Sequence, residues 1–319
     1  MSATATVVGS VGLPNPIMTA SGTSGHGNEL ADYGDLSRLG AVVVKSVSVR
    51  PWDGNPPPRV HEVGSGMLNS VGLQGPGLEV WLARDLPALA GCGARVVVSI
   101  WGQSVDDYAG AAAMLARATG SPRGDQGASA IVAVEVNVSC PNVEDRSRMF
   151  AHSETATAQV VAATECGLPR WVKLSPNVPD ITAIAGAALG AGAEALTLTN
   201  TLLGLALDID TGRPLLGGGG GGLSGEGLHP VAVRAVWDCR KAFPDAAIIG
   251  VGGVASSRDA VEFLMAGADA VQVGTATFRD PRAPWKVLRD VTRWCERKGT
   301  TVNALRAAAR SQRASEVTE

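Results

Sequence analysis

Eight short apolar runs alternate with helix-like segments along the chain, and this alternation restricts the possible fold more than any other feature. The intervening segments are rich in Ala and Leu with helical spacing, as in VDDYAGAAAMLARA and SRDAVEFLMAGA. Alternation of strands and helices predicts a parallel sheet, and eight such units predict an α/β fold, a closed (β/α)8 TIM barrel. An open doubly wound sheet is the competing architecture. The runs are PIMTA (16–20), AVVVKSV (41–47), RVVVSI (95–100), IVAVEVN (131–137), WVKLS (171–175), EALTLTN (194–200), AIIGVGG (247–253) and AVQVG (270–274).

The chain length fits one such barrel, which needs about 250 residues or more, because the chain has 319. We find no internal repeat and no linker, so residues 1–319 are expected to form a single domain. Ser104 with Asp107, and Ser256 with Asp259, have the spacing of helix N-caps with an acidic first turn.

Two longer segments, 48–77 and 201–227, follow predicted strands and therefore predict long loops at the C-terminal face of the barrel. Active sites of barrels lie at this face, so loops of this length suggest a lid over a ligand. The GGGGGG run at 217–222 can alternatively be a flexible spacer, at least in its first half.

Composition excludes several classes of protein. Hydrophobic residues make up 45% and charged residues 18% of the chain, which is typical of a globular protein. The net charge of −3 and the lack of a basic cluster argue against nucleic-acid binding. No apolar run approaches the ~18 to 20 residues that span a bilayer, and the N-terminus lacks a signal peptide pattern, so we expect a soluble cytoplasmic protein without a membrane partner. Five scattered cysteines without a CxxC pair predict reduced thiols and no metal site.

The run IVAVEVN (131–137) is followed, three residues after its end, by the thiol of Cys140. By the two-residue period of a strand, its valines face the helices, and Glu135 and Asn137 point into the barrel. For Glu135 a satisfied polar network is the favoured interpretation. Asn137 and Asn142 flank Cys140 within six residues, and Pro141 fixes the turn that presents the thiol. This spacing favours a functional cysteine, and we interpret the following residues, VEDRSRMF, as a mobile flap.

Lysines and asparagines at strand ends indicate a ligand. Lys45 and Lys173 each stand among apolar residues, where one lysine alone can snorkel to the surface but two in one barrel suggest an anionic or electron-rich ligand. Each asparagine amide offers both a donor and an acceptor, which suits a planar ligand that has both. The candidates are Asn69, Asn137, Asn142 and Asn200.

Glycines follow the last two predicted strands, in GVGGV (250–254) and VGTA (273–276). Barrels commonly hold a phosphate at this position on backbone N–H groups and a helix N-terminus. SGEG (224–227) offers a further backbone donor. The pattern predicts a phosphorylated ligand without naming it.

The chain resembles the class 1 dihydroorotate dehydrogenases in the order and content of its motifs. The matching motifs cover nearly the whole chain: NPIMTASGT, KSVS, GNPPPRV, GMLNSVGLQGPG, NVSCPN, VKLSPN, LTNTL, GGLSG, GVGG and VGTATF. The resemblance implies a (β/α)8 barrel that binds FMN at its C-terminal face and oxidises dihydroorotate to orotate in pyrimidine biosynthesis. Two departures are Ser99 and Gly75, where the family often has asparagine, and the first puts one FMN contact in doubt.

The resemblance also implies roles for individual residues. Cys140 matches the base that removes the C5 proton of dihydroorotate while C6 delivers hydride to the flavin. The substrate pocket matches Lys45, Asn69, Val71, Gly72, Leu73, Asn137, Asn142, Asn200 and Thr201. The FMN site matches Ser21, Lys45, Ser46, Asn137, Lys173, Thr199, Gly225, Gly252, Gly253, Gly274 and Thr275. We expect nearby lysines to bring the pKa of the thiol toward working pH.

The resemblance leaves two electron acceptors to choose between, fumarate and NAD. Class 1 members either form homodimers that reduce fumarate or associate with an iron–sulfur flavoprotein subunit that passes electrons to NAD, and the motifs lean toward the second group. A dihydropyrimidine dehydrogenase-like flavoenzyme and a non-catalytic flavin- or phosphate-binding barrel are the alternative functions.

Overall fold

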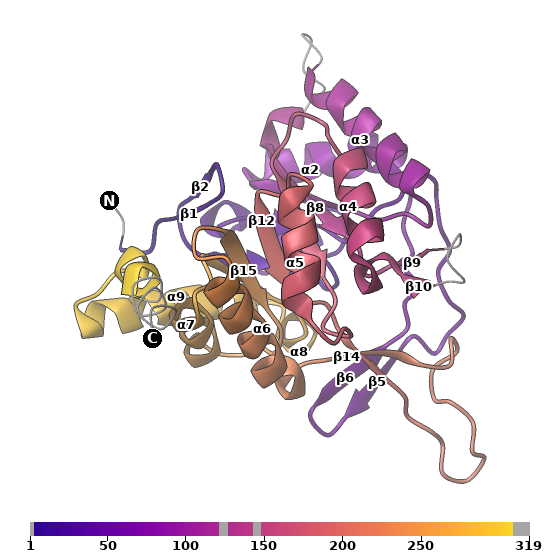
Figure 1. Ribbon diagram of the computed structural model, residues 1–319. Coiled ribbons are helices and arrows are strands. Elements are labelled where there is room, and N and C mark those ends of the chain that lie inside the picture. Colours follow the sequence, from indigo (N-terminus) through magenta and orange to yellow (C-terminus); the bar gives the residue numbers. More distant parts are fainter. Residues whose placement is uncertain (1–2, 121–126, 143–147, 309–319) are drawn as a thin grey trace.

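The computed structural model describes residues 3–120, 127–142 and 148–308, and its centre is a barrel of eight parallel strands (Figure 1). A parallel bridge between Met18 and Ala41 joins the two edge strands, and Thr19 N donates to Ala41 O at 3.3 Å, so the sheet closes on itself. This confirms the predicted TIM barrel over the open sheet. In sheet order the strands are β3 (Ile17–Thr19), β16 (Ala270–Val273), β15 (Ala247–Val251), β12 (Ala195–Leu198), β11 (Arg170–Leu174), β8 (Ile131–Asn137), β7 (Val96–Ile100) and β4 (Val42–Val43).

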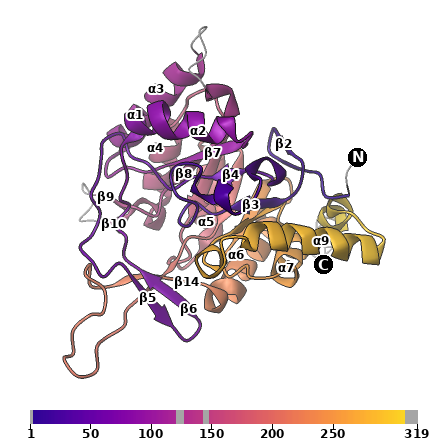
Figure 2. The ribbon, with the colours of Figure 1, turned by 180° about the vertical axis from the view of Figure 1, so that it is seen from behind.

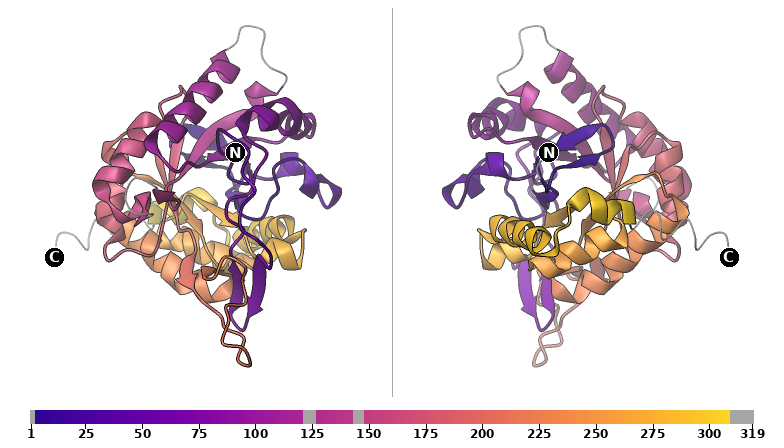
Figure 3. Two further views of the ribbon diagram at one scale, coloured as in Figure 1. Left: turned by 90° about the vertical axis from the view of Figure 1, so that its right-hand side faces the viewer. Right: turned by 90° about the vertical axis from the view of Figure 1, so that its left-hand side faces the viewer.

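Helices surround the strands (Figure 3), and the predicted N-caps are present. Ser256 and Asp259 form a capping box, and Asp107 N donates to the Ser104 hydroxyl at 3.2 Å. The longest helix at the C-terminal end, α9, packs beside β3 (Figure 2). The helices are α1 (Leu78–Val80), α2 (Leu86–Gly91), α3 (Val105–Gly120), α4 (Glu154–Ala163), α5 (Ile181–Gly190), α6 (His229–Ala242), α7 (Ser257–Ala266), α8 (Ala276–Arg279) and α9 (Ala283–Lys298), with shorter turns η1 (Glu29–Asp32), η2 (Leu36–Arg38), η3 (Trp81–Asp85), η4 (Ala128–Ala130), η6 (Phe150–His152) and η7 (Glu226–Leu228). Among the described residues, none of the helices has the length and apolarity to span a bilayer.

The two long insertions form a second sheet at the C-terminal face of the barrel. The hairpin β5 (Val60–Val63) and β6 (Gly66–Asn69) pairs with β14 (Gly221–Ser224) and β13 (Leu202–Gly204) of the other insertion. Figure 1 shows these strands projecting from the barrel. At the opposite end, the hairpin β1 (Thr6–Val8) and β2 (Val11–Leu13) packs on the apolar barrel interior.

The hexaglycine run is not a spacer, so that alternative is wrong. Its last residues belong to β14, and Gly217 N donates to Pro58 O at 2.8 Å. A Cβ on Gly217 would collide with the backbone carbonyls of Pro56 and Pro57, so glycine is needed for this close approach.

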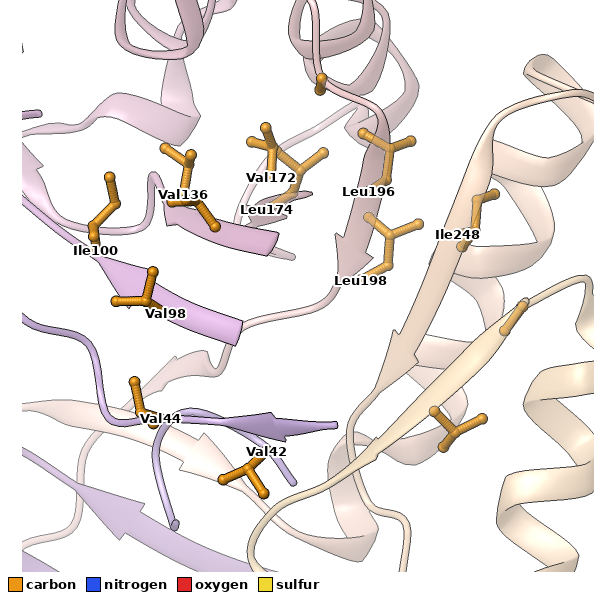
Figure 4. Close-up of a cluster of buried hydrophobic side chains, with 14 of the residues drawn as sticks. Val42, Val44, Val98, Ile100, Val136, Val172, Leu174, Leu196, Leu198 and Ile248 are labelled. Atoms are coloured by element: carbon orange, nitrogen blue, oxygen red, sulfur yellow. The ribbon is translucent and has the colours of Figure 1, made fainter. Parts of the chain in front are cut away.

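Strand β8 shows how the core is divided between the two faces of the barrel sheet. Val134 and Val136 lie in the outer cluster between strands and helices, as predicted, and Figure 4 shows Val136 beside Val98 and Val172 of neighbouring strands. Val132 instead packs against the interior cluster, so its predicted orientation is wrong. The register between β7 and β8 shifts at this point, and the extra residue interrupts the alternation of side chains.

Candidate active site

A cleft lies at the carboxyl ends of the barrel strands, beneath the second sheet. Its outer part measures about 550 Å³ and its deeper part about 160 Å³. The two parts are continuous, because they share Val60, Met67, Gly225, Gly253, Thr275 and Phe278 as lining residues. Both long insertions therefore cover the cleft, as predicted for a lid.

The deeper part brings together most of the residues that the sequence predicts. They come from β3, β4, β6, β8, β11, β12, β14, β15 and β16 and the loops that follow these strands. The predicted residues that line it are Ser21, Lys45, Ser46, Asn69, Val71, Leu73, Asn137, Lys173, Thr199, Asn200, Thr201, Gly225, Gly252, Gly253, Gly274 and Thr275. Gly72 does not line it; its positive φ of 73° turns the loop, and its Cα approaches Asn55. Asn142 lies in the short strand β9 (Pro141–Asn142), and its side chain is outside the described part of the chain.

Cys140 is buried just behind this cavity and is not among its described lining residues. The thiol Sγ lies 3.4 Å from the carbonyl oxygen of Asn137, and the Tyr108 hydroxyl donates to the same oxygen at 2.6 Å. Burial raises the pKa of the Cys140 thiol to about 12, although Tyr108 and Lys45 act in the opposite direction. The expectation that nearby lysines bring this pKa toward working pH is therefore not met in this conformation, because desolvation outweighs them.

The chain after Cys140 folds back as a hairpin. Strand β9 pairs with β10 (Arg148–Met149), and Phe150 packs edge-on against the Tyr108 ring with centroids 5.5 Å apart. Residues 143–147 of the predicted flap lie outside the described residues. At its far end the segment is anchored by the buried Phe150.

Lys45 carries a cation that acts on the thiol. Burial lowers the pKa of its ammonium to about 8, and Lys173 acts in the same direction, while Cys140 opposes the shift. At neutral pH the ammonium therefore still holds its proton, but its poor solvation favours an anionic ligand.

Asparagine amides are held in fixed orientations beside Lys45. Asn137 Oδ1 accepts from Asn200 Nδ2 at 3.2 Å, and Asn137 Nδ2 lies 3.4 Å from the Ser46 hydroxyl. Asn200 Oδ1 accepts from Thr201 N at 2.9 Å. Because each amide has a second donor or acceptor position left over, the group can bind the polar edge of a planar ligand.

Glu135 belongs to a satisfied polar network, as the sequence predicts. Its carboxylate accepts from Gln272 Nε2 at 2.7 Å and from the Ser99 hydroxyl at 3.3 Å, and it lies 3.9 Å from Lys173 Nζ. Lys173 Nζ also donates to Ser21 at 3.3 Å. The network thus connects to Lys173, which lines the cavity.

Three participants were not predicted from the sequence as part of this arrangement. The inward orientation of Gln272 could have been predicted from the sequence. Gln272 lies on β16, two residues before Gly274, and the two-residue period of a strand directs both toward the same side. Tyr108 reaches the thiol from α3, and no local pattern marks it. The Ser99 hydroxyl lies 2.8 Å from the Ser46 hydroxyl. Ser99 thus helps to orient Ser46, which is a predicted FMN contact.

The outer end of the deeper cavity has the features of a phosphate site. Gly252 and Gly253 have φ values of 140° and 67°, which favour glycine, and a Cβ on Gly253 would lie 2.8 Å from Gly225 O. Thr275 Oγ1 donates to Ser224 Oγ at 2.8 Å. Backbone N–H groups after β15 and β16 can therefore approach a ligand closely.

These residues fit a phosphorylated flavin. Within the described part of the chain, Thr199 Oγ1 is buried at the cavity without a hydrogen-bond partner, which leaves it available to a polar ring edge. Two lysines and three amides surround the same space. Across residues 3–120, 127–142 and 148–308, we find no cluster of His, Cys, Asp and Glu that could hold a metal ion.

Comparison with known proteins agrees with this site. Residues 3–294 match the family described as dihydroorotate dehydrogenase. The chain belongs to the dihydroorotate dehydrogenase family. It is therefore an FMN-dependent oxidoreductase that acts on dihydroorotate in pyrimidine biosynthesis.

Curated relatives are similar over nearly their whole length. A protein of Desulforudis audaxviator is 46% identical over 96% of this chain and 97% of its own. Proteins of Desulforamulus reducens and Citrifermentans bemidjiense are each 43% identical, over 95% and 90% of this chain and 97% and 91% of theirs. Each of the three is named dihydroorotate dehydrogenase B (NAD(+)), catalytic subunit. These names describe each relative as one subunit of its enzyme.

Proposed function

We propose that Cys140 is the base of this dihydroorotate dehydrogenase and that electrons leave the enzyme through an iron–sulfur flavoprotein subunit to NAD. The observation that carries the proposal is the meeting of Lys45, Asn137 and Asn200 at a cavity that the glycine loops also line, with the Cys140 thiol held against the Asn137 carbonyl. Bound FMN supplies the hydride acceptor. The chain orients the substrate and the FMN, provides the positive charge of its lysines and provides the base.

Substrate binding is proposed for the inner end of the cavity. The Lys45 ammonium pairs with the dihydroorotate carboxylate, which compensates the burial of that cation. The amides bind the ring carbonyls and N–H groups, as each amide both donates and accepts. This substrate site comprises Lys45, Asn69, Val71, Leu73, Asn137, Asn142, Asn200 and Thr201, and Gly72 turns the loop that carries Val71 and Leu73.

Cofactor binding is proposed for the remaining cavity. Lys173 places positive charge where the reduced flavin gains negative charge, and Thr199 offers its unpaired hydroxyl to the ring. The glycines hold the phosphate on backbone N–H groups. The FMN site comprises Ser21, Lys45, Ser46, Asn137, Lys173, Thr199, Gly225, Gly252, Gly253, Gly274 and Thr275.

Proton removal requires Cys140 to act as a thiolate. The thiol turns from the Asn137 carbonyl toward the cavity and gives its proton to solvent before the substrate binds, and the Lys45 cation favours this ionisation. The thiolate then takes the C5 proton as C6 loses hydride, and the C5–C6 double bond of orotate forms. The adjacent amides keep C5 within reach of Sγ during this step.

Partner binding rests on two observations. The relatives are named catalytic subunits, and the cysteines of this chain are scattered without a CxxC pair, so the iron–sulfur cluster belongs to the partner. A homodimer is the proposed core of the complex. The exposed, alternating side chains of Leu203, Leu205 and Leu207 on the projecting arm support a surface that another protein covers.

We expect dihydroorotate to bleach the flavin of the FMN-loaded protein under anaerobic conditions, and dihydrouracil to leave it oxidised. The carboxylate that Lys45 binds is absent from dihydrouracil, so only dihydroorotate is held against the thiol. Absorbance of the flavin after mixing measures both reactions. Faster bleaching by dihydrouracil would favour the dihydropyrimidine dehydrogenase-like alternative.

Acceptor assays test the partner. With dihydroorotate present, the chain purified together with its partner subunit is expected to reduce NAD, and the chain alone is not. Fumarate serves as the comparison acceptor. Rapid reduction of fumarate by the isolated chain would contradict the NAD assignment.

A further inference from the structure

His229, the first residue of α6, lies behind the glycine loop that follows β15. Its Nδ1 is 2.9 Å from the carbonyl oxygen of Gly252, and its Nε2 is 3.3 Å from the carboxylate of Glu262 on α7. The Gly252 carbonyl oxygen can only accept, so Nδ1 is the donor in this bond. The Phe263 ring packs edge-on against it at 5.0 Å, which fixes its plane.

The contact with Gly252 determines where the next N–H group points. The peptide between Gly252 and Gly253 is trans, and in a trans peptide the carbonyl and the following N–H point in opposite directions. When His229 holds the Gly252 carbonyl on the helix side, the Gly253 N–H is directed to the other side. Gly253 lines the cleft on that side.

Because glycines flank this peptide, a contact from outside the loop is needed to fix its orientation. Gly252 and Gly253 both have positive φ, and neither has a side chain that would oppose rotation of the peptide between them. The backbone of Gly253 packs closely on His229, since a Cβ on Gly253 would lie 2.6 Å from that of His229. The histidine is thus in contact with both glycines of the loop.

We propose that His229 is a positioning residue for the flavin phosphate: it holds the Gly252 carbonyl so that the Gly253 N–H points into the cleft as a phosphate donor. The inference rests on the proposed FMN site. Glu262 contacts the ring from its other side, and the side chain of His229 is only 13% exposed, so water competes little for its bond to Gly252.

Titration of the apoprotein with FMN and with riboflavin tests this role, because riboflavin lacks the phosphate. His229→Ala is expected to weaken FMN binding by about 10- to 100-fold, the effect of one hydrogen bond to a charged group, and to leave riboflavin binding within about twofold. In His229→Asn the amide nitrogen is attached at the same position as Nδ1. It therefore restores FMN binding to within about fivefold of the unaltered protein.

Two further variants complete the experiment. His152→Ala, an exposed histidine on η6, is the matched control and binds both flavins normally. Glu262→Ala removes a carboxylate that is 53% exposed, so the fold is retained, and it weakens FMN alone by about two- to fivefold. It tests the proposal even if His229→Ala does not fold.

The result that supports the proposal is a loss confined to FMN and recovered by asparagine. Equal losses for FMN and riboflavin, no loss in His229→Ala, or no recovery in His229→Asn would each overturn it. Failure of the unaltered protein to bind either flavin would instead reject the FMN site itself, together with any role of His229 there.

Discussion

Replacing Cys140 with alanine is expected to slow reduction of the bound flavin by dihydroorotate by about 10²- to 10⁴-fold, the usual contribution of a general base. The cavity offers lysines and amides near the substrate, but in the neutral pH range an ammonium cannot accept a proton and an amide is too weak a base. Among the residues that the structure describes there, Cys140 places beside Asn137 a thiol that becomes a base once it is ionised. Anaerobic rapid mixing measures the rate of flavin bleaching.

Cys239→Ala is the matched control for this variant. Cys239 is also fully buried, and burial also raises its pKa to about 12, but it lies in the outer cluster between helices and strands. Its replacement is expected to leave flavin reduction unchanged. An unaltered rate in Cys140→Ala would reject the cysteine as the base, and equal losses in both variants would indicate damage to the fold.

Replacing Lys173 with methionine is expected to lower the free energy of unfolding by about 3–5 kcal/mol, because a buried charge loses its partner. The carboxylate of Glu135 is fully buried, and Lys173 Nζ, at 3.9 Å, is its one cation in the described network. The same change removes positive charge from the flavin site, so FMN binding weakens as well. Urea unfolding of the apoprotein and FMN titration measure the two effects separately.

The double variant Lys173→Met with Glu135→Gln separates the two roles of the lysine. Neutralising the carboxylate is expected to restore most of the stability while FMN binding stays weak. Lys241→Met, on the exposed face of α6, is the control and changes neither quantity. Normal stability of Lys173→Met would contradict the importance of the buried pair.

Local patterns in the sequence predict the barrel well. Each strand carries its own period of two, so Glu135 and Asn137 could be placed inside and Val134 outside without knowledge of any neighbour. The glycines at 252 and 253 likewise mark the proposed phosphate loop from local sequence alone. Val132 departs from the pattern because the shift in register depends on how β7 pairs with β8.

The environment of Cys140 could not be predicted in this way. Its burial depends on Tyr108 from α3 and Phe150 beyond the hairpin, and these contacts join segments far apart in the chain. From the sequence, the charge of the nearby lysines predicts a lowered pKa for the Cys140 thiol. The magnitude of desolvation, which reverses that shift, follows only from the packed structure.

Removal of the C5 proton of dihydroorotate by the Cys140 thiol is the decisive step at this cavity. Anaerobic single-turnover reduction of the FMN-loaded protein by dihydroorotate deuterated at C5 tests this step. We expect the flavin to bleach and the deuterated substrate to react several-fold more slowly in the unaltered protein. A flavin that stays oxidised, or that bleaches at the same rate with either substrate, would contradict it.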